Sequence, residues 1–332
     1  MKILFLTPQY LPHIGGVEKH LSQVIVHLPL EYSVTIVTAR NTNADLEHEK
    51  IGRADVWRLP TQTKKSIWSW LTHHLFLLRD ADVIHIHDVF FWILPFRLLF
   101  FWKRMYMTFH GYEAPGPVTL KYILWHQCAE LCTDGNICVG SFHQNVYDVE
   151  PTAITYGGVT HTEKVKKRKT HSIIFVGRLD EDTGILWYMK ALLLLQLQGE
   201  TYHLDIFGDG PLKKTLEKYS TEYHLDITLH GAVADVDHRF ASYDIAFASQ
   251  YLSIMQALSA GTQVIAFADS EIKHEYLHSA PFSFWISIAS SVQGIVDAVQ
   301  DKDDFAEEPI VNWARGETWK KVSDHYLQVW NT

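Results

Sequence analysis

Short apolar runs alternate along this chain with apolar residues at helical spacing. The first run, residues 3–6, predicts a strand buried on both faces, as in a parallel sheet. After a proline-containing loop, apolar side chains recur at Val17, Leu21, Val24 and Leu28, the spacing of one helix face. The beginning of the chain therefore predicts a strand, a loop and a helix.

The alternation continues in two series. Strand-like runs lie at residues 34–37, 83–87, 105–108 and 135–139, and then at 172–176, 203–207, 227–229, 245–247 and 264–267. A polar, basic stretch at 160–169 separates the series and is typical of an inter-domain linker. We therefore expect two doubly wound α/β domains built from right-handed βαβ units. Ligands of such sheets bind beyond the carboxyl ends of the strands, which predicts a site in the cleft between the domains.

A glycine pair, Gly15 and Gly16, stands where the first helix begins. Glycine lets the backbone approach a ligand closely, and a helix N-terminus offers N–H groups at its positive end. This arrangement suits a phosphate or a sugar oxygen. A simple tight turn between strand and helix is the alternative, since the dinucleotide glycine fingerprint is absent.

Polar residues and glycines follow several of the predicted strands. His85 and His87 alternate onto one face of their strand, and His110 follows the next strand. These three could converge on a metal, but no carboxylate or thiolate joins them at a ligand-like spacing. Hydrogen-bonded histidines at the strand ends are the alternative. In the second series Arg178 and the glycines Gly208 and Gly210 occupy the equivalent places.

Composition narrows the class of protein. A length of 332 residues predicts two domains, and a formal charge of −9 argues against nucleic acid as the main partner. Three cysteines cannot form a closed disulfide framework, so we expect a reducing, cytoplasmic setting. Cys128 and Cys132 are better read as buried thiols than as a metal pair. We expect no signal peptide, since the first strand starts at Lys2.

Several short motifs, in their order and spacing, resemble a known family. They are residues 15–18 (Gly-Gly-Val-Glu), 108–113, 156–159, 176–179, 207–211 and the closing segment from Glu317 to Tyr326. With these motifs the chain resembles the retaining glycosyltransferases of family 4, and the resemblance covers nearly its whole length. It implies the GT-B architecture, two Rossmann-like domains facing across a cleft.

The resemblance also implies boundaries and an activity. It implies an acceptor-side domain at 1–160, a linker at 161–170, a nucleotide-sugar domain at 171–315 and a helix at 316–332 that packs back on the first domain. The expected reaction moves a hexose, with retention, from a UDP- or GDP-sugar to a glycan or lipid-linked acceptor of the cell envelope. It requires no metal or cofactor. A sugar-nucleotide epimerase shares this architecture, but its catalytic carboxylates are absent.

Individual roles follow from the same resemblance. It implies that Gly15 and Gly16 lie near the donor phosphates and the acceptor, and that His110 contacts the donor sugar near the reacting carbon. Arg178 would neutralise the departing diphosphate, which agrees with the charge that develops there. Gly208 and Gly210 are implied in the donor-phosphate loop.

The chain departs from the family pattern at three positions. Thr183 replaces the second phosphate-binding lysine, and Gln256 and Ser249 replace a pair of glutamates. The resemblance still implies a phosphate contact for Thr183, and ribose or sugar contacts for Gln256, Ser253 and Ser249. Glutamine keeps hydrogen bonds but loses the charge-assisted part. A working branch with altered donor geometry and a degenerate, non-catalytic partner subunit both remain open.

Residues 89–104 are the most apolar part of the chain and are rich in phenylalanine and tryptophan. The segment is too short for a spanning helix and is interrupted by Pro95 and Arg97. Core packing explains much of it, while the flanking Lys103 and Arg104 also fit a segment resting on anionic lipid. The second interpretation predicts peripheral attachment to the inner membrane face.

Overall fold

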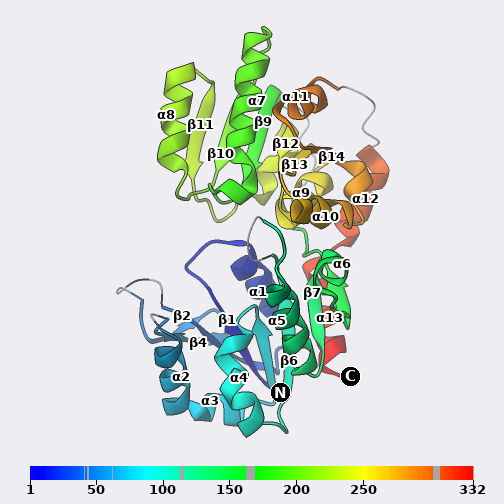
Figure 1. The fold of residues 1–332 in the computed structure, drawn as a ribbon. Coiled ribbons are helices and arrows are strands. Elements are labelled where there is room, and N and C mark those ends of the chain that lie inside the picture. Colours follow the sequence, from blue (N-terminus) through cyan, green and yellow to red (C-terminus); the bar gives the residue numbers. More distant parts are fainter. Residues whose placement is uncertain are drawn as a thin grey trace. The chain divides into compact units, whose positions relative to one another are not determined.

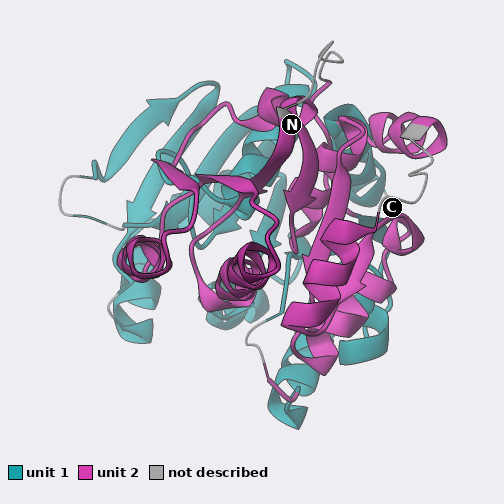
Figure 2. Cartoon of the chain, turned by 90° about the horizontal axis from the view of Figure 1, so that it is seen from above, with its two compact units in different colours: residues 1–113, 118–155, 319–332 teal, residues 114–117, 156–318 magenta. Residues whose placement is uncertain are grey.

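The computed structural model describes residues 1–40, 42, 45–61, 63–112, 116–161, 169–301 and 307–331. The chain divides into two compact units, coloured separately in Figure 2. Unit 1 comprises Met1–Glu113, Val118–Thr155 and Trp319–Thr332, and unit 2 comprises Ala114–Pro117 and Tyr156–Thr318. Most of the expected linker, residues 162–168, lies outside the described residues.

Unit 1 contains an eight-stranded sheet in the order β3-β4-β2-β1-β5-β6-β7-β8 (Figure 1). The strands are β1 (Lys2–Thr7), β2 (Ser33–Ala39), β3 (His48–Ile51), β4 (Ala54–Leu59), β5 (Val83–His87), β6 (Arg104–Phe109), β7 (Asn136–Val139) and β8 (Ala153–Thr155). Strand β3 runs antiparallel to β4, and the other pairs are parallel. Strand β1 lies between β2 and β5 with its apolar run buried, as the sequence predicts.

The helices of unit 1 connect these strands. They are α1 (Gly16–His27), α2 (Lys64–His73), α3 (Leu75–Asp80), α4 (Phe90–Leu99), α5 (Leu120–Leu131), α6 (Phe142–Tyr147) and α13 (Trp319–Trp330). Helix α1 buries Leu21 and Val24, two positions of its predicted apolar face. Helix α13, from the end of the chain, packs on α1 and belongs to unit 1.

Unit 2 contains a six-stranded parallel sheet in the order β11-β10-β9-β12-β13-β14. Its strands are β9 (Lys169–Val176), β10 (His203–Phe207), β11 (Ile227–Gly231), β12 (Tyr243–Phe247), β13 (Gln263–Phe267) and β14 (Ser287–Ala289). Its helices are α7 (Ile185–Leu197), α8 (Lys213–Tyr223), α9 (Tyr251–Ser259), α10 (Glu271–His278), α11 (Val292–Gln300) and α12 (Glu307–Gly316), with short 3-10 turns η1 (Glu181–Thr183), η2 (Asp237–Ser242) and η3 (Ser283–Trp285). The expectation of two α/β domains with parallel sheets is confirmed.

The aromatic segment 89–104 is partly buried and partly exposed. Helix α4 buries Phe90, Trp92 and Phe96, so its inner face is core. The turn after it exposes Phe101 by 71% and Trp102 by 61%. Across the described residues, every helix is too short or too polar to cross a bilayer.

Candidate functional site

The histidines at the strand ends of unit 1 come together. Parallel pairing of β5 with β6 sets His87 opposite Thr108, and the chain turns after β6 so that His110 follows. His87 Nδ1 lies 2.7 Å from His110 Nε2, and their rings stack. Burial, the largest cause, holds the pKa of both histidines well below the usual range. The pair is therefore neutral at physiological pH.

The proton positions of this pair follow from one buried atom. His87 Nε2 is buried and has no hydrogen-bond partner among the described residues. A buried N–H without an acceptor is rarer in proteins than an unused lone pair, so we place the His87 proton on Nδ1. His87 then donates to His110 Nε2, and the His110 proton lies on Nδ1. The backbone N–H of His110 donates to Asp88 Oδ1 at 3.0 Å, which fixes the loop.

Helix α13 holds the neighbouring histidine. Trp330 Nε1 donates to His85 Nδ1 at 2.9 Å, and His85 Nε2 lies 2.7 Å from Thr108 Oγ1. Since the indole N–H can only donate, neutral His85 must carry its proton on Nε2 and donate it to Thr108. A side chain near the end of the chain thus sets the tautomer of a strand-end histidine.

A second residue of α13 links this strand end to α1. Tyr326 Oη lies 3.1 Å from Thr108 Oγ1 and 3.0 Å from His20 Nε2. The His20 ring meets the His110 ring edge-on at 4.9 Å between centroids. Burial lowers the pKa of His20 to about 3. Sequence reasoning did not identify His20, Tyr326 or Trp330 as parts of the site, because partners 245 and 306 residues apart in the chain leave no local signal.

At the start of α1 the glycine pair faces a carboxylate. A Cβ on Gly15 would lie 2.3 Å from Glu18 Oε2, so a larger residue at this position would require the Glu18 carboxylate to move. Glu18 is buried, and its Oε1 lies 2.5 Å from His13 Nδ1. Gly16 is the first residue of the helix. A carboxylate already placed beside Gly15 repels a phosphate and accepts from a hydroxyl, so this turn favours a sugar hydroxyl as its ligand.

In unit 2, Arg178 follows β9 and is paired with carboxylates. Its Nη2 lies 2.7 Å from Asp182 Oδ2, and its Nη1 lies 3.8 Å from Asp180 Oδ2. The arginine side chain is 58% exposed. Thr183 is buried, and its hydroxyl donates to the Asp180 carbonyl at 2.7 Å. The arginine is thus accessible, whereas the hydroxyl at the position of the missing lysine is occupied within its own turn.

The glycines after β10 allow two loops to touch. A Cβ on Gly208 would lie 1.8 Å from the Gly177 carbonyl oxygen, and one on Gly210 would lie 2.6 Å from the Leu179 carbonyl oxygen. Backbone hydrogen bonds from Gly177 to Phe207 and from Leu179 to Asp209 join the same loops. These glycines therefore hold the Arg178 loop against the end of β10, whatever they contribute to a phosphate.

The residues implied in ribose and sugar binding lie in or just before α9 and differ in their burial. Ser249 is buried, lies 2.6 Å from Tyr188 Oη and accepts from the Phe267 N–H at 2.9 Å. Gln256 is also buried; it accepts from the Thr160 N–H at 3.0 Å and donates to the Thr160 carbonyl at 2.9 Å. Both side chains are thus engaged inside unit 2 rather than presented to a ligand.

The first turn of α9 differs from these buried positions. Ser253 is half-buried in this turn and donates to the Gln250 carbonyl at 2.9 Å. Gln250 precedes the helix without making a side-chain capping bond, and its Nε2 lies 3.5 Å from Asp182 Oδ2. The structure therefore brings both Arg178 and the N-terminus of α9 close to Asp182. The guanidinium and the helix dipole favour an anion here, the Asp182 carboxylate opposes one, and the first amide of α9, Tyr251 N–H, already donates to Tyr276 Oη at 3.0 Å.

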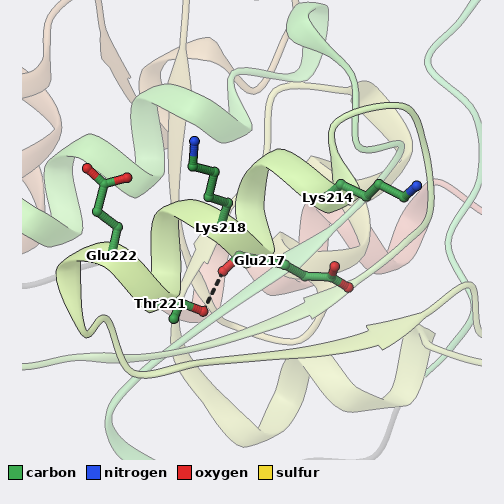
Figure 3. A pocket seen from close by; sticks show the side chains of 5 residues that line it. All are labelled: Lys214, Glu217, Lys218, Thr221 and Glu222. Atoms are coloured by element: carbon green, nitrogen blue, oxygen red, sulfur yellow. Dashed lines mark hydrogen bonds between the residues drawn. The ribbon is translucent and has the colours of Figure 1, made fainter.

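A metal site and a surface hollow were also considered as functional sites, and neither is assigned. Among the described residues no group of three histidine, cysteine or carboxylate side chains could hold a metal ion. A shallow hollow lies on α8, lined by Lys214, Glu217, Lys218, Thr221 and Glu222 (Figure 3). All five belong to one helix, and its lysines and glutamates are interleaved as on an ordinary solvated face, so we do not assign the hollow as a site.

Comparison with known protein families identifies the family of this chain. Residues 14–148 match the model described as Glycosyltransferase Family 4, and residues 170–308 match the model described as Glycosyl transferases group 1. The chain belongs to glycosyltransferase family 4. Its two α/β units with parallel sheets are the two Rossmann-like domains of the GT-B fold.

Solved structures agree on the fold of this family 4 protein. Sucrose-phosphate synthase from Thermosynechococcus elongatus superposes with a TM-score of 0.75 at 13% identity, over 100% of this chain and 98% of that chain. Anabaena HepE in complex with UDP and glucose gives 0.74 at 13% identity, over 100% and 99%. These identities are low, so the similarity establishes the fold alone.

One curated relative is similar in sequence. The GtfA subunit of UDP-N-acetylglucosamine–peptide N-acetylglucosaminyltransferase from Limosilactobacillus reuteri is 30% identical over 132 residues, which is 38% of this chain. The match spans about a quarter, 26%, of the length of that relative.

Proposed function

We propose that this family 4 glycosyltransferase moves a hexose, with retention, from a UDP- or GDP-sugar to a glycan or a lipid-linked acceptor in cell-envelope synthesis. The observation that carries the donor part is the accessible Arg178, whose partner Asp182 lies next to Gln250 at the N-terminus of α9. UDP complexes of the similar Anabaena HepE support a nucleotide donor.

The proposed chemistry centres on the leaving group. Breaking the bond between the sugar and the diphosphate leaves two negative charges or more on the nucleoside diphosphate. Arg178 would stabilise that charge by charge-assisted hydrogen bonds, and the dipole of α9 would add to it. These groups supply positive potential without a metal, and we propose that the reaction needs no metal or cofactor.

His110 would contact the donor sugar. Its pKa is held well below the usual range by burial, so it acts as a neutral hydrogen-bonding group and contributes no charge to the leaving diphosphate. We propose that the acceptor attacks from the face that the diphosphate leaves, which requires no protein nucleophile. The Gly15 turn, with its Glu18 carboxylate, would accept a hydrogen bond from a sugar hydroxyl.

A screen of nucleotide binding tests this proposal. Thermal shift with UDP, GDP, ADP and their sugars should show stabilisation by one base series, since a ligand that binds the folded state raises its stability by mass action. Arg178→Ala should weaken that nucleotide at least about tenfold. Arg79→Gln, which removes a 69%-exposed arginine of unit 1, is the matched control and should bind as the wild type does. No response to any nucleotide would contradict a donor site.

A non-catalytic binding subunit is the second candidate. Thr183, Ser249 and Gln256, at three positions where the family implies donor contacts, all direct their side chains inward. A subunit of this kind would bind its partner without consuming a nucleotide sugar. Release of nucleoside diphosphate from a bound sugar donor by the purified protein would exclude this candidate.

We also propose that the protein is cytoplasmic and rests on the inner membrane face through Phe101, Trp102 and Leu98. Leu98 is 85% exposed, beside the two exposed aromatics. Lys103 Nζ donates to the Ala81 carbonyl at 2.6 Å and Arg104 to the Trp330 carbonyl, so attachment would rest on apolar contact more than on basic charge.

Vesicle flotation tests this attachment. Phe101→Ser with Trp102→Ser should abolish binding to vesicles of phosphatidylglycerol and phosphatidylethanolamine. Leu30→Ser, which removes a leucine 90% exposed elsewhere in unit 1, should leave binding intact. Failure of the wild-type protein to float with any vesicle would contradict the proposal.

A further inference from the structure

A lysine is buried beside the Arg178 loop. Lys273 lies in the first turn of α10, is only 2% exposed, and its Nζ donates to the Asp182 carbonyl at 3.3 Å. The ammonium also lies 5.1 Å from the centre of the Tyr276 ring. Lysine is almost never fully buried unless its charge is compensated, and here the Asp182 and Asp269 carboxylates favour the charged form.

The neighbouring carboxylate, that of Asp182, has a hydrogen-bond partner for only one of its two oxygens. Asp182 Oδ2 accepts from Arg178, but Asp182 Oδ1 is buried and has no hydrogen-bond partner among the described residues. A buried carboxylate oxygen without a donor is costly. Asp182 thus lies between an accessible arginine and a buried lysine, with one oxygen unsatisfied.

Binding of a diphosphate would change this balance. Arg178 can offer both of its Nη groups to phosphate oxygens only if Nη2 leaves Asp182, which would strand a carboxylate beside a second anion. Lys273 already touches the backbone of the same residue, so a side-chain rotation can bring Nζ to the carboxylate. We propose that Lys273 is a positioning residue that takes over the charge of Asp182 and so releases Arg178 to the donor diphosphate. This inference rests on the proposed function.

The role differs from that of the lysine absent at position 183. A lysine there would touch the phosphate directly, whereas Lys273 is shielded from solvent and acts through Asp182 and Arg178. The charge deficit left by Thr183 is thereby made up from another element, α10.

The direction of its pH dependence follows from the groups that face it. Burial lowers the pKa of Lys273 to about 8; the Asp182 and Asp269 carboxylates oppose this shift, and Arg178 adds to it. Lys273 is therefore charged at pH 7 and mostly neutral at pH 9. Affinity for a nucleoside diphosphate should fall over that interval.

Calorimetric titration with UDP, GDP and ADP at pH 7 and pH 9 tests the proposal. With the nucleotide that binds, Lys273→Met should weaken affinity about tenfold at pH 7 and remove the pH dependence. Lys273→Arg should restore affinity and keep it constant to pH 9. Lys190→Met, which removes an exposed lysine of α7, is the matched control and should behave as the wild type.

A double substitution separates this role from direct phosphate binding. If Lys273 serves only to neutralise Asp182, Asp182→Asn with Lys273→Met should bind as tightly as Asp182→Asn alone. A double variant as weak as Lys273→Met would overturn the proposal, and so would wild-type affinity in Lys273→Met. If Lys273→Met does not fold, Asp182→Asn decides, since the proposal requires its affinity to be independent of pH from 7 to 9.

The controls distinguish this inference from the proposed function. A wild type that binds no nucleotide overturns both. Binding that Arg178→Ala abolishes and Lys273→Met leaves unchanged overturns the role of Lys273 alone.

Discussion

Gln256 stands where family 4 implies a glutamate, and its amide does what a carboxylate cannot. It accepts from the N–H and donates to the carbonyl of the same residue, Thr160, 96 positions away in the chain. A glutamate could accept but not donate, which would leave the carbonyl without this partner. This geometry gives Gln256 a packing role in unit 2 that a glutamate could not fill.

The two hydrogen bonds between Gln256 and Thr160 predict a specific loss of stability on substitution. Gln256→Glu should lower the free energy of unfolding by about 2 kcal/mol, because it buries a carboxylate against the Thr160 carbonyl. Urea denaturation measures this change. Gln328→Glu, an exposed position on α13, should change stability by less than about 0.5 kcal/mol. Equal effects at the two positions would show that the hydrogen bonds between Gln256 and Thr160 do not contribute to stability.

The neutral histidines of unit 1 predict loss of stability in acid. Burial holds the pKa of His20 at about 3 and those of His85, His87 and His110 well below 6.5. Below pH 6.5 the unfolded chain takes up protons that the folded chain refuses, so stability should fall as pH falls. The slope should approach about 1.4 kcal/mol per pH unit for each histidine.

Denaturation at pH 7 and pH 5 measures this slope. His20→Gln removes one titrating group and should make the slope shallower, whereas His73→Gln, at an exposed position of α2, should not. Equal slopes in all three proteins would show that these histidines are not the cause.

Among the elements, the loops after β9 and β10 depend on glycine for their contact. Gly208→Ala should destabilise the protein by about 3 kcal/mol, because the new methyl group would overlap the Gly177 carbonyl. Gly316→Ala, where a Cβ meets nothing within 4 Å, is the matched control. Thermal melting of both variants gives the answer, and a Gly208→Ala protein as stable as the control would refute the contact.

Helix α13 is expected to stabilise unit 1 through Tyr326. Tyr326→Phe keeps the ring but removes the hydroxyl that joins Thr108 to His20, and should cost about 1–2 kcal/mol. Tyr122→Phe, on α5, provides a comparison at a half-buried tyrosine. A cost no greater than that of the comparison would mean that the network contributes nothing to stability.

The elements also show what sequence patterns can reveal. Long apolar runs such as residues 3–6 and 172–176 identified buried parallel strands, because burial on both faces leaves an unbroken apolar signal. The β3–β4 pair, β8 and β14 were not predicted, since β3 is polar at the sheet edge and β8 and β14 have three residues each. A short or half-exposed strand carries no such signal.

The candidate site was predictable in its strand ends and not in its tertiary partners. His110 and Arg178 each follow a parallel strand, and the sequence pattern predicts which residues follow such strands. The contact of Trp330 with His85 and that of Lys273 with Asp182 join segments 245 and 91 residues apart. Only the folded chain brings those groups together.

For the molecule as a whole, we expect this family 4 protein to be an active transferase and not a binding subunit. The proposed donor residues, around Arg178 and α9, lie in unit 2, and the buried neutral histidines lie in unit 1. If the protein is active, a bound nucleotide sugar should be slowly hydrolysed when water takes the place of the acceptor.

Release of nucleoside diphosphate from UDP- and GDP-sugars tests that claim most directly. We predict slow, metal-independent release by the wild type, unchanged by EDTA, lost in Arg178→Ala and retained in Arg79→Gln. Tight nucleotide-sugar binding with no release from any donor, in the presence or absence of divalent metal, would contradict the account.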